Sequence, residues 1–208
     1  MPSPPNCSAK YPQWMRWITL AWFALWFPMY WRTWGAANFV HLCDVAVILT
    51  SIGMWTNSSL LISSQAVGAF VVDVAWAADA TSRIVLGHAL FPGNEYLTNP
   101  HYPLWIRSLT IFHLVMPALL LWGIYRMGYN RRGYALQCAI ALLVFIVARF
   151  TQPSANIDFA FSDPFFHRAW GPAPAHVLFT WLFMVVVVYA PTHLLLKRFF
   201  RAPEATAV

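Results

Sequence analysis

Residues 38–50 read NFVHLCDVAVILT and predict the first half of an apolar helix. Asn38, His41 and Asp44 follow one another at three-residue spacing, so on a helix their side chains would lie along one side. An imidazole and a carboxylate in an apolar segment cost several kcal/mol unless they are paired, neutralised or turned toward a polar cavity. We therefore treat this stretch as the candidate functional site and look for the residues that reach it.

The composition predicts an all-α integral membrane protein. Apolar residues make up 60% of the 208 residues and charged residues 10%, whereas soluble domains average about 45–50% and 25%. The length allows about six transmembrane helices in one domain, residues 13–198, between a disordered tail at 1–12 and a loose tail at 199–208. Most Lys and Arg residues stand singly at the ends of apolar runs, which predicts contact with the lipid bilayer and no binding of nucleic acid.

Six apolar segments predict the membrane spans, and two long loops separate some of them, at 88–102 and 151–174. The third span carries several polar residues, so we expect it to be packed inside the bundle. The first span is rich in tryptophan, which is typical of membrane interfaces. The predicted spans cover residues 14–31, 37–55, 60–86, 104–125, 134–150 and 175–196.

The distribution of positive charges predicts the orientation. With six spans both termini lie on one side of the membrane, together with eight of the thirteen Lys and Arg residues, so the positive-inside rule places the termini in the cytoplasm. We expect a multi-pass protein of a bacterial inner membrane. Seven polar residues from four spans then fall at one depth, in the outer half of the bilayer: His41, Asp44, Asp79, Arg83, Arg107, His113 and Arg149.

Several kinds of chemistry fit this group of residues. Asp79 and Arg83, at i and i+4 on one helix, predict a structural ion pair. His41 and Asp44 could be a base and the residue that orients it, or two ligands of a divalent metal such as zinc or iron, with His113 and Asp79 as the other candidate ligands. A purely structural hydrogen-bonded network is the alternative, and a haem held by His41 and His113 stays open.

Four segments resemble a group of uncharacterised bacterial integral membrane proteins: FVHLCDVAVIL at 39–49, RSLTIFH at 107–113, GYNRR at 128–132 and NID at 156–158. More distantly the chain is similar to the YwaF-like family and to the androgen-induced membrane hydrolases. The latter cleave fatty acid esters of hydroxy fatty acids with a threonine and a histidine on different spans. The resemblance implies that His113 is the catalytic histidine. The position of the threonine falls near His41, so this chain departs from that pattern.

We expect an intramembrane hydrolase or acyl-transfer enzyme that acts on a lipid-like ester or amide from the outer leaflet. His113 would be the general base, and His41 with Asp44 the second catalytic unit. Four further residues would contact the substrate: Arg83, Arg107, Thr110 and Asn156.

Two other functions remain open. The chain could be a non-enzymatic accessory or assembly subunit of a larger membrane complex, with its buried charges fixing the order of the helices. It could also be a small transporter, which would need a polar path that continues inward past Asp73. An enzyme needs a cavity that reaches His41, Asp44 and His113, whereas an accessory subunit would have these groups fully paired.

Overall fold

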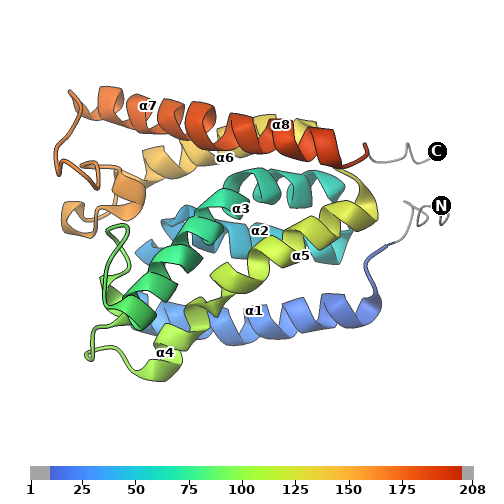
Figure 1. Cartoon of the computed structure of the whole chain (residues 1–208), viewed down its shortest axis with the longest axis horizontal. Coiled ribbons are helices and arrows are strands. Elements are labelled where there is room, and N and C mark those ends of the chain that lie inside the picture. The colour runs from blue at the N-terminus through green and yellow to red at the C-terminus, as the bar shows by residue number, and fades with distance from the viewer. Residues whose placement is uncertain (1–9, 203–208) are drawn as a thin grey trace.

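The computed structural model describes residues 10–202, and all regular elements in that part of the chain are helical (Figure 1). They form six rods, several of which combine consecutive helical elements. The rods are α1 (Gln13–Trp34); η1 (Ala36–Val40) with α2 (Leu42–Thr56); α3 (Ser59–Thr81) with the π-helical η2 (Ser82–Leu86); α4 (Leu104–Ser108), η4 (Leu109–Ile111) and α5 (Phe112–Met127); α6 (Arg132–Ala148); and α7 (Ala173–Phe183), the π-helical η7 (Met184–Tyr189) and α8 (Ala190–Phe199). The loops contain the short 3₁₀ helices η3 (Glu95–Leu97), η5 (Pro153–Ala155) and η6 (Ile157–Phe159).

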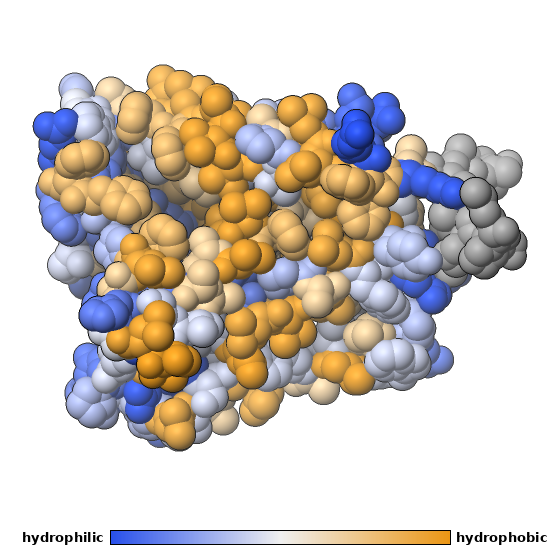
Figure 2. All heavy atoms as spheres, viewed as in Figure 1, coloured by the Kyte–Doolittle hydropathy of each residue, from blue (hydrophilic) through white to orange (hydrophobic). Residues whose placement is uncertain are grey.

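Three rods are long and apolar enough to cross a membrane: Ser59–Leu86, Leu104–Met127 and Ala173–Phe199. Figure 2 shows apolar side chains across the middle of the visible face and hydrophilic ones gathered mainly toward its two ends, consistent with contact with a lipid bilayer. Helices α2 and α6 have 15 and 17 residues. Each therefore measures about 22–26 Å, somewhat less than a hydrocarbon core of roughly 30 Å. The structure thus gives three long candidate spans where the sequence predicts six crossings.

Helix α3 is the centre of the bundle. It packs against α2, α5, α6, η7 and α8, and Figure 1 shows it in the middle of the assembly. Its polar side chains are buried at Ser63, Ser64, Gln65, Asp73 and Asp79. The prediction that this polar helix lies inside the bundle is therefore confirmed.

The described parts of the two predicted tails are held against the bundle. Of the N-terminal tail the structure describes residues 10–12, and Tyr11 is buried, with its N–H donating to Asn57 Oδ1 at 2.9 Å. Of the C-terminal tail it describes residues 199–202, and the carbonyl of Arg201 accepts from the N–H of Tyr129 at 2.6 Å. The remaining tail residues lie outside the described part.

Helices α3 and α6 approach so closely that one residue between them has to be glycine. A Cβ on Gly133 would lie 2.8 Å from the backbone of both Ser63 and Ser64. Just before it, the N–H of Asn130 donates to Ser63 Oγ at 2.9 Å. Because rigid backbone stands opposite Gly133, any side chain there must push the two helices apart.

The contact between α3 and α6 gives a stability prediction. We expect Gly133→Ala to lower the free energy of unfolding by about 1–2 kcal/mol, since overpacking costs more than the helix propensity of alanine returns. Ala135→Val, at an exposed position of the same helix, is the control and should change it by less than about 0.5 kcal/mol. Thermal unfolding in detergent measures both, and a higher midpoint for Gly133→Ala would contradict the close approach.

Candidate functional site

The two long loops lie together at one end of the bundle, on the left in Figure 1. We call this the loop end, and it comprises residues 35–41, 82–111 and 149–173. The other end, on the right, carries the chain termini and the short connections. The residues that the sequence singles out lie at or near the loop end, and most of them bind the loops.

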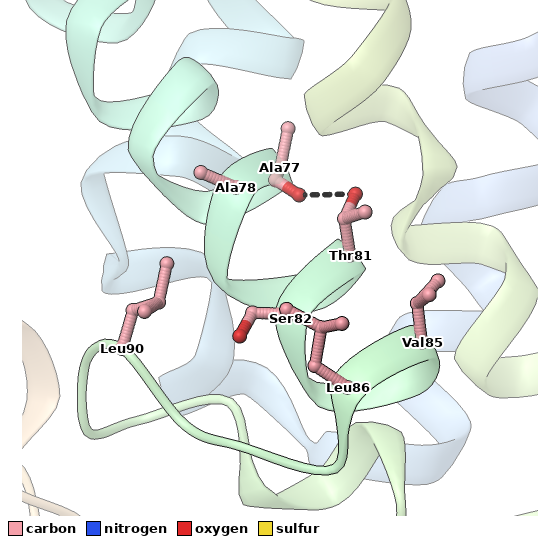
Figure 3. A pocket seen from close by; sticks show the side chains of 7 residues that line it. All are labelled: Ala77, Ala78, Thr81, Ser82, Val85, Leu86 and Leu90. Carbon is pink, nitrogen blue, oxygen red and sulfur yellow. Dashed lines mark hydrogen bonds between the residues drawn. The ribbon is translucent and has the colours of Figure 1, made fainter.

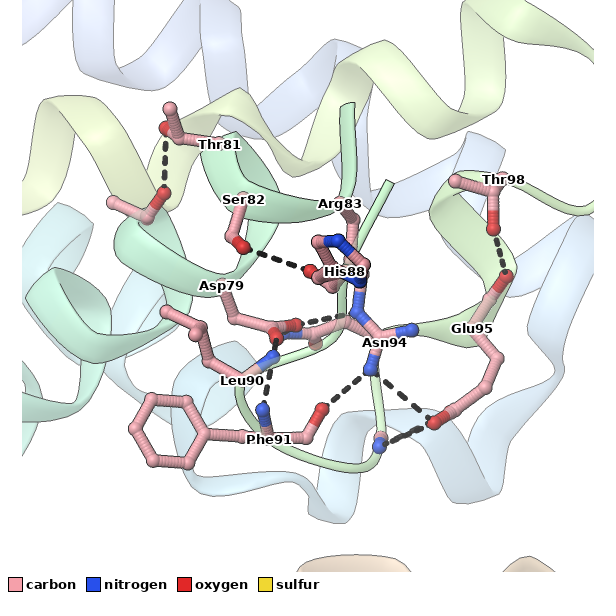
Figure 4. Close-up of polar contacts among 12 residues, drawn as sticks. Asp79, Thr81, Ser82, Arg83, His88, Leu90, Phe91, Asn94, Glu95 and Thr98 are labelled. Carbon is pink, nitrogen blue, oxygen red and sulfur yellow. Dashed lines mark hydrogen bonds and ion pairs between the residues drawn. The ribbon is translucent and has the colours of Figure 1, made fainter. Parts of the chain in front are cut away.

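Asp79 is the hub of the first loop (Figure 4). Its side chain is fully buried, and its two oxygens accept four hydrogen bonds, which matches the acceptor capacity of a carboxylate. The donors are Arg83 Nε at 2.6 Å, the N–H groups of Leu90 at 2.6 Å and Phe91 at 2.9 Å, and Asn94 Nδ2 at 2.8 Å. Asp79 and Arg83 therefore form an ion pair that also fixes the loop, and we refer to this group as the Asp79 cage.

The two arginines predicted to hold substrate also bind this loop. Arg83 donates to the carbonyl oxygen of Phe91 and lies 3.4 Å from Glu95 Oε1. Arg107 Nη1 donates to the carbonyl oxygen of Leu97 at 2.7 Å. Thr110, a third predicted substrate contact, is buried and donates to the carbonyl oxygen of Arg107 at 2.6 Å. In this structure these three side chains have partners within the protein.

Asn156, the fourth predicted substrate contact, organises the second loop. Its Nδ2 donates to the carbonyl oxygen and to Oγ of Ser162, at 2.9 and 3.1 Å, and its Oδ1 accepts from the N–H groups of Phe161 and Ser162. Its φ of 41° lies in the left-handed region, which asparagine tolerates better than most residues. Arg149, at the end of α6, adds a bond to the carbonyl oxygen of Ala160 at 3.3 Å.

His176 ties the second loop to α7 and was not among the predicted site residues. It is fully buried, and its Nδ1 accepts from the N–H of Trp170 at 3.1 Å while its Nε2 lies 3.0 Å from the carbonyl oxygen of Phe159. This pair of partners requires a neutral ring that carries its proton on Nε2. The sequence shows a histidine near the start of a span but gives no sign of these two partners.

Asp163 shapes the outer part of the same loop. Its Oδ1 accepts from the N–H groups of Phe165 at 2.9 Å and Phe166 at 2.6 Å. Desolvation alone would raise the pKa of Asp163, but these hydrogen bonds stabilise the carboxylate and hold the pKa below its usual value. The turn is therefore built around an ionised carboxylate at neutral pH.

His41 pairs with Asp158, which corrects the expectation that Asp44 orients it. His41 Nδ1 lies 3.2 Å from Asp158 Oδ1, and Asp158 Oδ2 accepts from the N–H of Leu42 at 2.8 Å. Three-residue spacing does not align His41 with Asp44 because α2 begins only at Leu42, and His41 precedes it with extended backbone. Asp44 instead accepts from Asn38 Nδ2 at 2.5 Å.

Asp158 thus caps the start of α2, although it lies 116 positions from Leu42 in the sequence. A carboxylate at the first N–H groups of a helix satisfies donors that the helix itself leaves open and is favoured by the helix dipole. Asp158 has a φ of 48°, and its neighbour Phe159 one of 60°, so the chain adopts left-handed backbone to reach this position. Such conformations cost free energy in residues other than glycine, and here they coincide with the contact to His41.

His113 packs against two aromatic rings. Its centroid lies 4.3 Å from that of Trp76 on α3, with the planes nearly parallel, and 4.0 Å from that of Phe112. Its Nδ1 lies 3.0 Å from the carbonyl oxygen of Thr110, and the residue is buried. The ring is held rigidly and forms no hydrogen bond to His41 or Asp44.

The geometry does not support the metal site suggested by the sequence. Residues 10–202 contain no group of three or more His, Cys, Asp and Glu side chains that could hold a metal ion. The four candidate ligands are divided among separate networks: Asp79 in its cage, His113 against Trp76, Asp44 with Asn38, and His41 with Asp158.

An apolar groove of about 650 Å³ lies next to the Asp79 cage (Figure 3). It follows α3 into η2 and is closed at one side by Leu90, whose N–H donates to Asp79. Its lining contains none of the predicted catalytic residues. The lining residues are Ala77, Ala78, Thr81, Ser82, Val85, Leu86 and Leu90.

No known protein family, curated protein or solved structure matches the chain. Its class is therefore given by the fold: a helical membrane protein with both long loops anchored at one end by buried charged and polar residues.

The Asp79 cage gives a second prediction. Asp79→Asn removes the charge opposite Arg83 and places an N–H group where an acceptor is needed, so we expect the free energy of unfolding to fall by about 3 kcal/mol. Limited proteolysis should then cut within residues 88–102. Glu95→Gln is the control in the same loop, since Glu95 is two-thirds exposed and its contact to Arg83 is long, and it should cost less than about 1 kcal/mol. Equal effects of the two substitutions would show that the cage does not hold the loop.

Proposed function

We propose that the chain crosses a bacterial inner membrane six times, with both termini in the cytoplasm and the loop end facing outward. Helix α1 has 22 residues, and η1 lengthens the short α2 rod toward the loop end. The basic residues near the termini and short connections support this orientation through the positive-inside rule.

We further propose that the chain is an intramembrane hydrolase or acyl-transfer enzyme whose catalytic base is His41, oriented by Asp158. The contact of 3.2 Å between His41 Nδ1 and Asp158 Oδ1 carries this proposal. A carboxylate at Nδ1 fixes the ring and stabilises its protonated form, which leaves Nε2 to exchange protons with a substrate. Nε2 of His41 has no hydrogen-bond partner among the described residues, and the side chain is 34% exposed.

The reaction that fits is hydrolysis of an ester or amide. Water adds to the carbonyl carbon and gives a proton to Nε2 of His41, and the imidazolium then returns that proton to the leaving alcohol or amine as the carbonyl–heteroatom bond breaks. The products are a carboxylic acid and an alcohol or amine, and no electrons are exchanged. In the acyl-transfer case an alcohol replaces the water.

The apolar surroundings of His41 support a lipid-like substrate. Phe39, two residues before it, stacks on Phe27 of α1 with centroids 4.6 Å apart and lies 5.9 Å from the ring of Trp31. These aromatic side chains place the polar pair beside a surface suited to acyl chains. The distant resemblance to the androgen-induced membrane hydrolases points to the same substrate class, with His41 instead of His113 as the proposed base.

The pair of His41 and Asp158 gives the third prediction. Asp158→Asn should reduce hydrolysis of 4-methylumbelliferyl palmitate by the purified protein about 100-fold, because the ring loses its charged partner. The amide oxygen can still accept from the N–H of Leu42, so the thermal midpoint should change little. His41→Gln should abolish the activity, whereas His101→Gln, at an exposed position in the first loop, should leave it intact. Undiminished activity in Asp158→Asn and His41→Gln would contradict the proposal.

An accessory subunit of a membrane complex is the second candidate, and the Asp79 cage favours it. There the charged and amide side chains are engaged by the protein itself, as expected of groups that fix loops in place. Wild-type protein that cleaves neither long-chain esters nor amides, and whose His41→Gln variant only loses thermal stability, would favour this candidate.

A further inference from the structure

A second apolar groove, of about 530 Å³, runs between α1 and α5 toward the end of the bundle that carries the termini. Both helices contribute large apolar side chains, and a tryptophan from each lies at the terminal end of the groove. Trp14 is 58% exposed. The lining residues are Trp14, Met15, Leu114, Val115, Ala118, Leu119 and Trp122.

The length of the groove suits one acyl chain. From Leu114 to Trp122 the helix rises by about 12 Å at 1.5 Å per residue, close to the roughly 15 Å that one leaflet contributes to a hydrocarbon core. The tryptophans at its end match the position of aromatic belts at membrane interfaces. The groove therefore begins at an interface and continues toward the middle of the membrane.

Two polar groups without partners lie beside Trp122 at this end. The guanidinium carbon of Arg126 is 5.6 Å from the ring of Trp122, and Arg126 Nε is buried with no hydrogen-bond partner. The ring of Tyr11 is also 5.6 Å from that of Trp122, and its hydroxyl is likewise buried without a partner, in a residue only 3% exposed. Unpaired buried donors are costly, and a negative charge placed against the guanidinium of Arg126 would offset part of this cost by electrostatic attraction.

The terminal end carries an excess of positive charge, which favours an anionic partner. The ion pairs among the described residues all lie at the loop end and involve His41, Arg83 and their acidic partners. The terminal end has no Asp or Glu among residues 10–202, although it has many cations. These cations are Lys10, Arg16, Arg126, Arg131, Arg132, Lys197, Arg198 and Arg201.

We infer that this groove is a binding site for an anionic phospholipid, with one acyl chain between α1 and α5 and the phosphate at Arg126 beside Tyr11. The site rests on the proposed embedding of α1 and α5 in the membrane and not on the chemistry of His41. A lipid held here would tie the first helix to α5 and place a negative charge against the guanidinium of Arg126.

The test is the binding of palmitoyl-oleoyl-phosphatidylglycerol to the purified full chain, measured by native mass spectrometry and by the shift of the thermal midpoint. Arg126→Gln should weaken binding about fivefold, as expected for one arginine at a membrane surface. Ala118→Phe fills the groove without changing the charge and should weaken it at least as much. Arg131→Gln makes the same change of charge at an exposed residue of the same end and should bind as the wild type does.

Three outcomes would overturn the inference. Equal losses in Arg131→Gln and Arg126→Gln would mean diffuse attraction to the basic end. An equal midpoint shift with phosphatidylcholine would mean that the site does not select an anionic lipid. An equal midpoint shift with glycerol 3-phosphate, which has no acyl chain, would mean that binding does not use the groove. Ester hydrolysis is not part of this readout, so the result is independent of the proposed activity.

Discussion

The carboxylate of Asp158 connects the parts of this protein that matter most for its function. One oxygen accepts from the first N–H of α2 and the other faces His41, so the second loop, the start of α2 and the candidate base are fixed by one side chain. The next residue, Phe159, offers its carbonyl to His176 on α7. Two rods that are distant in sequence are thus joined through two consecutive loop residues in left-handed backbone.

The same physical constraint explains the other polar residues of the loop end. A charged or amide group buried in an apolar bundle must find partners, and here most partners are backbone groups of the loops. Asp79, Asn156 and Arg149 satisfy this requirement by holding a loop segment. Arg107 holds one through Nη1, while its buried Nε has no partner among the described residues. Polar residues that converge in a membrane protein therefore need not form one catalytic cluster. The pair of His41 and Asp158 differs from these anchors because the imidazole is partly exposed, at 34%.

Local periodicity and composition were sufficient to predict the helical class, the buried position of α3 and the spacing that allows the Asp79–Arg83 pair. They were insufficient for the partner of His41. The pattern of Asn38, His41 and Asp44 assumed one continuous helix, whereas the chain breaks at His41 between η1 and α2. Asp158 reaches His41 only because its loop adopts left-handed conformations, which depend on tertiary contacts that no local pattern encodes.

The tautomer of His41 is the most direct test of its pairing with Asp158. In protein labelled with ¹⁵N-histidine and placed in lipid nanodiscs, with the His41 signals assigned through His41→Gln, we expect a neutral ring protonated on Nδ1, the nitrogen that faces Asp158. Asp158→Asn should then shift the balance between the two tautomers. A ring protonated on Nε2, unchanged by Asp158→Asn, would contradict the pairing on which the proposed chemistry depends.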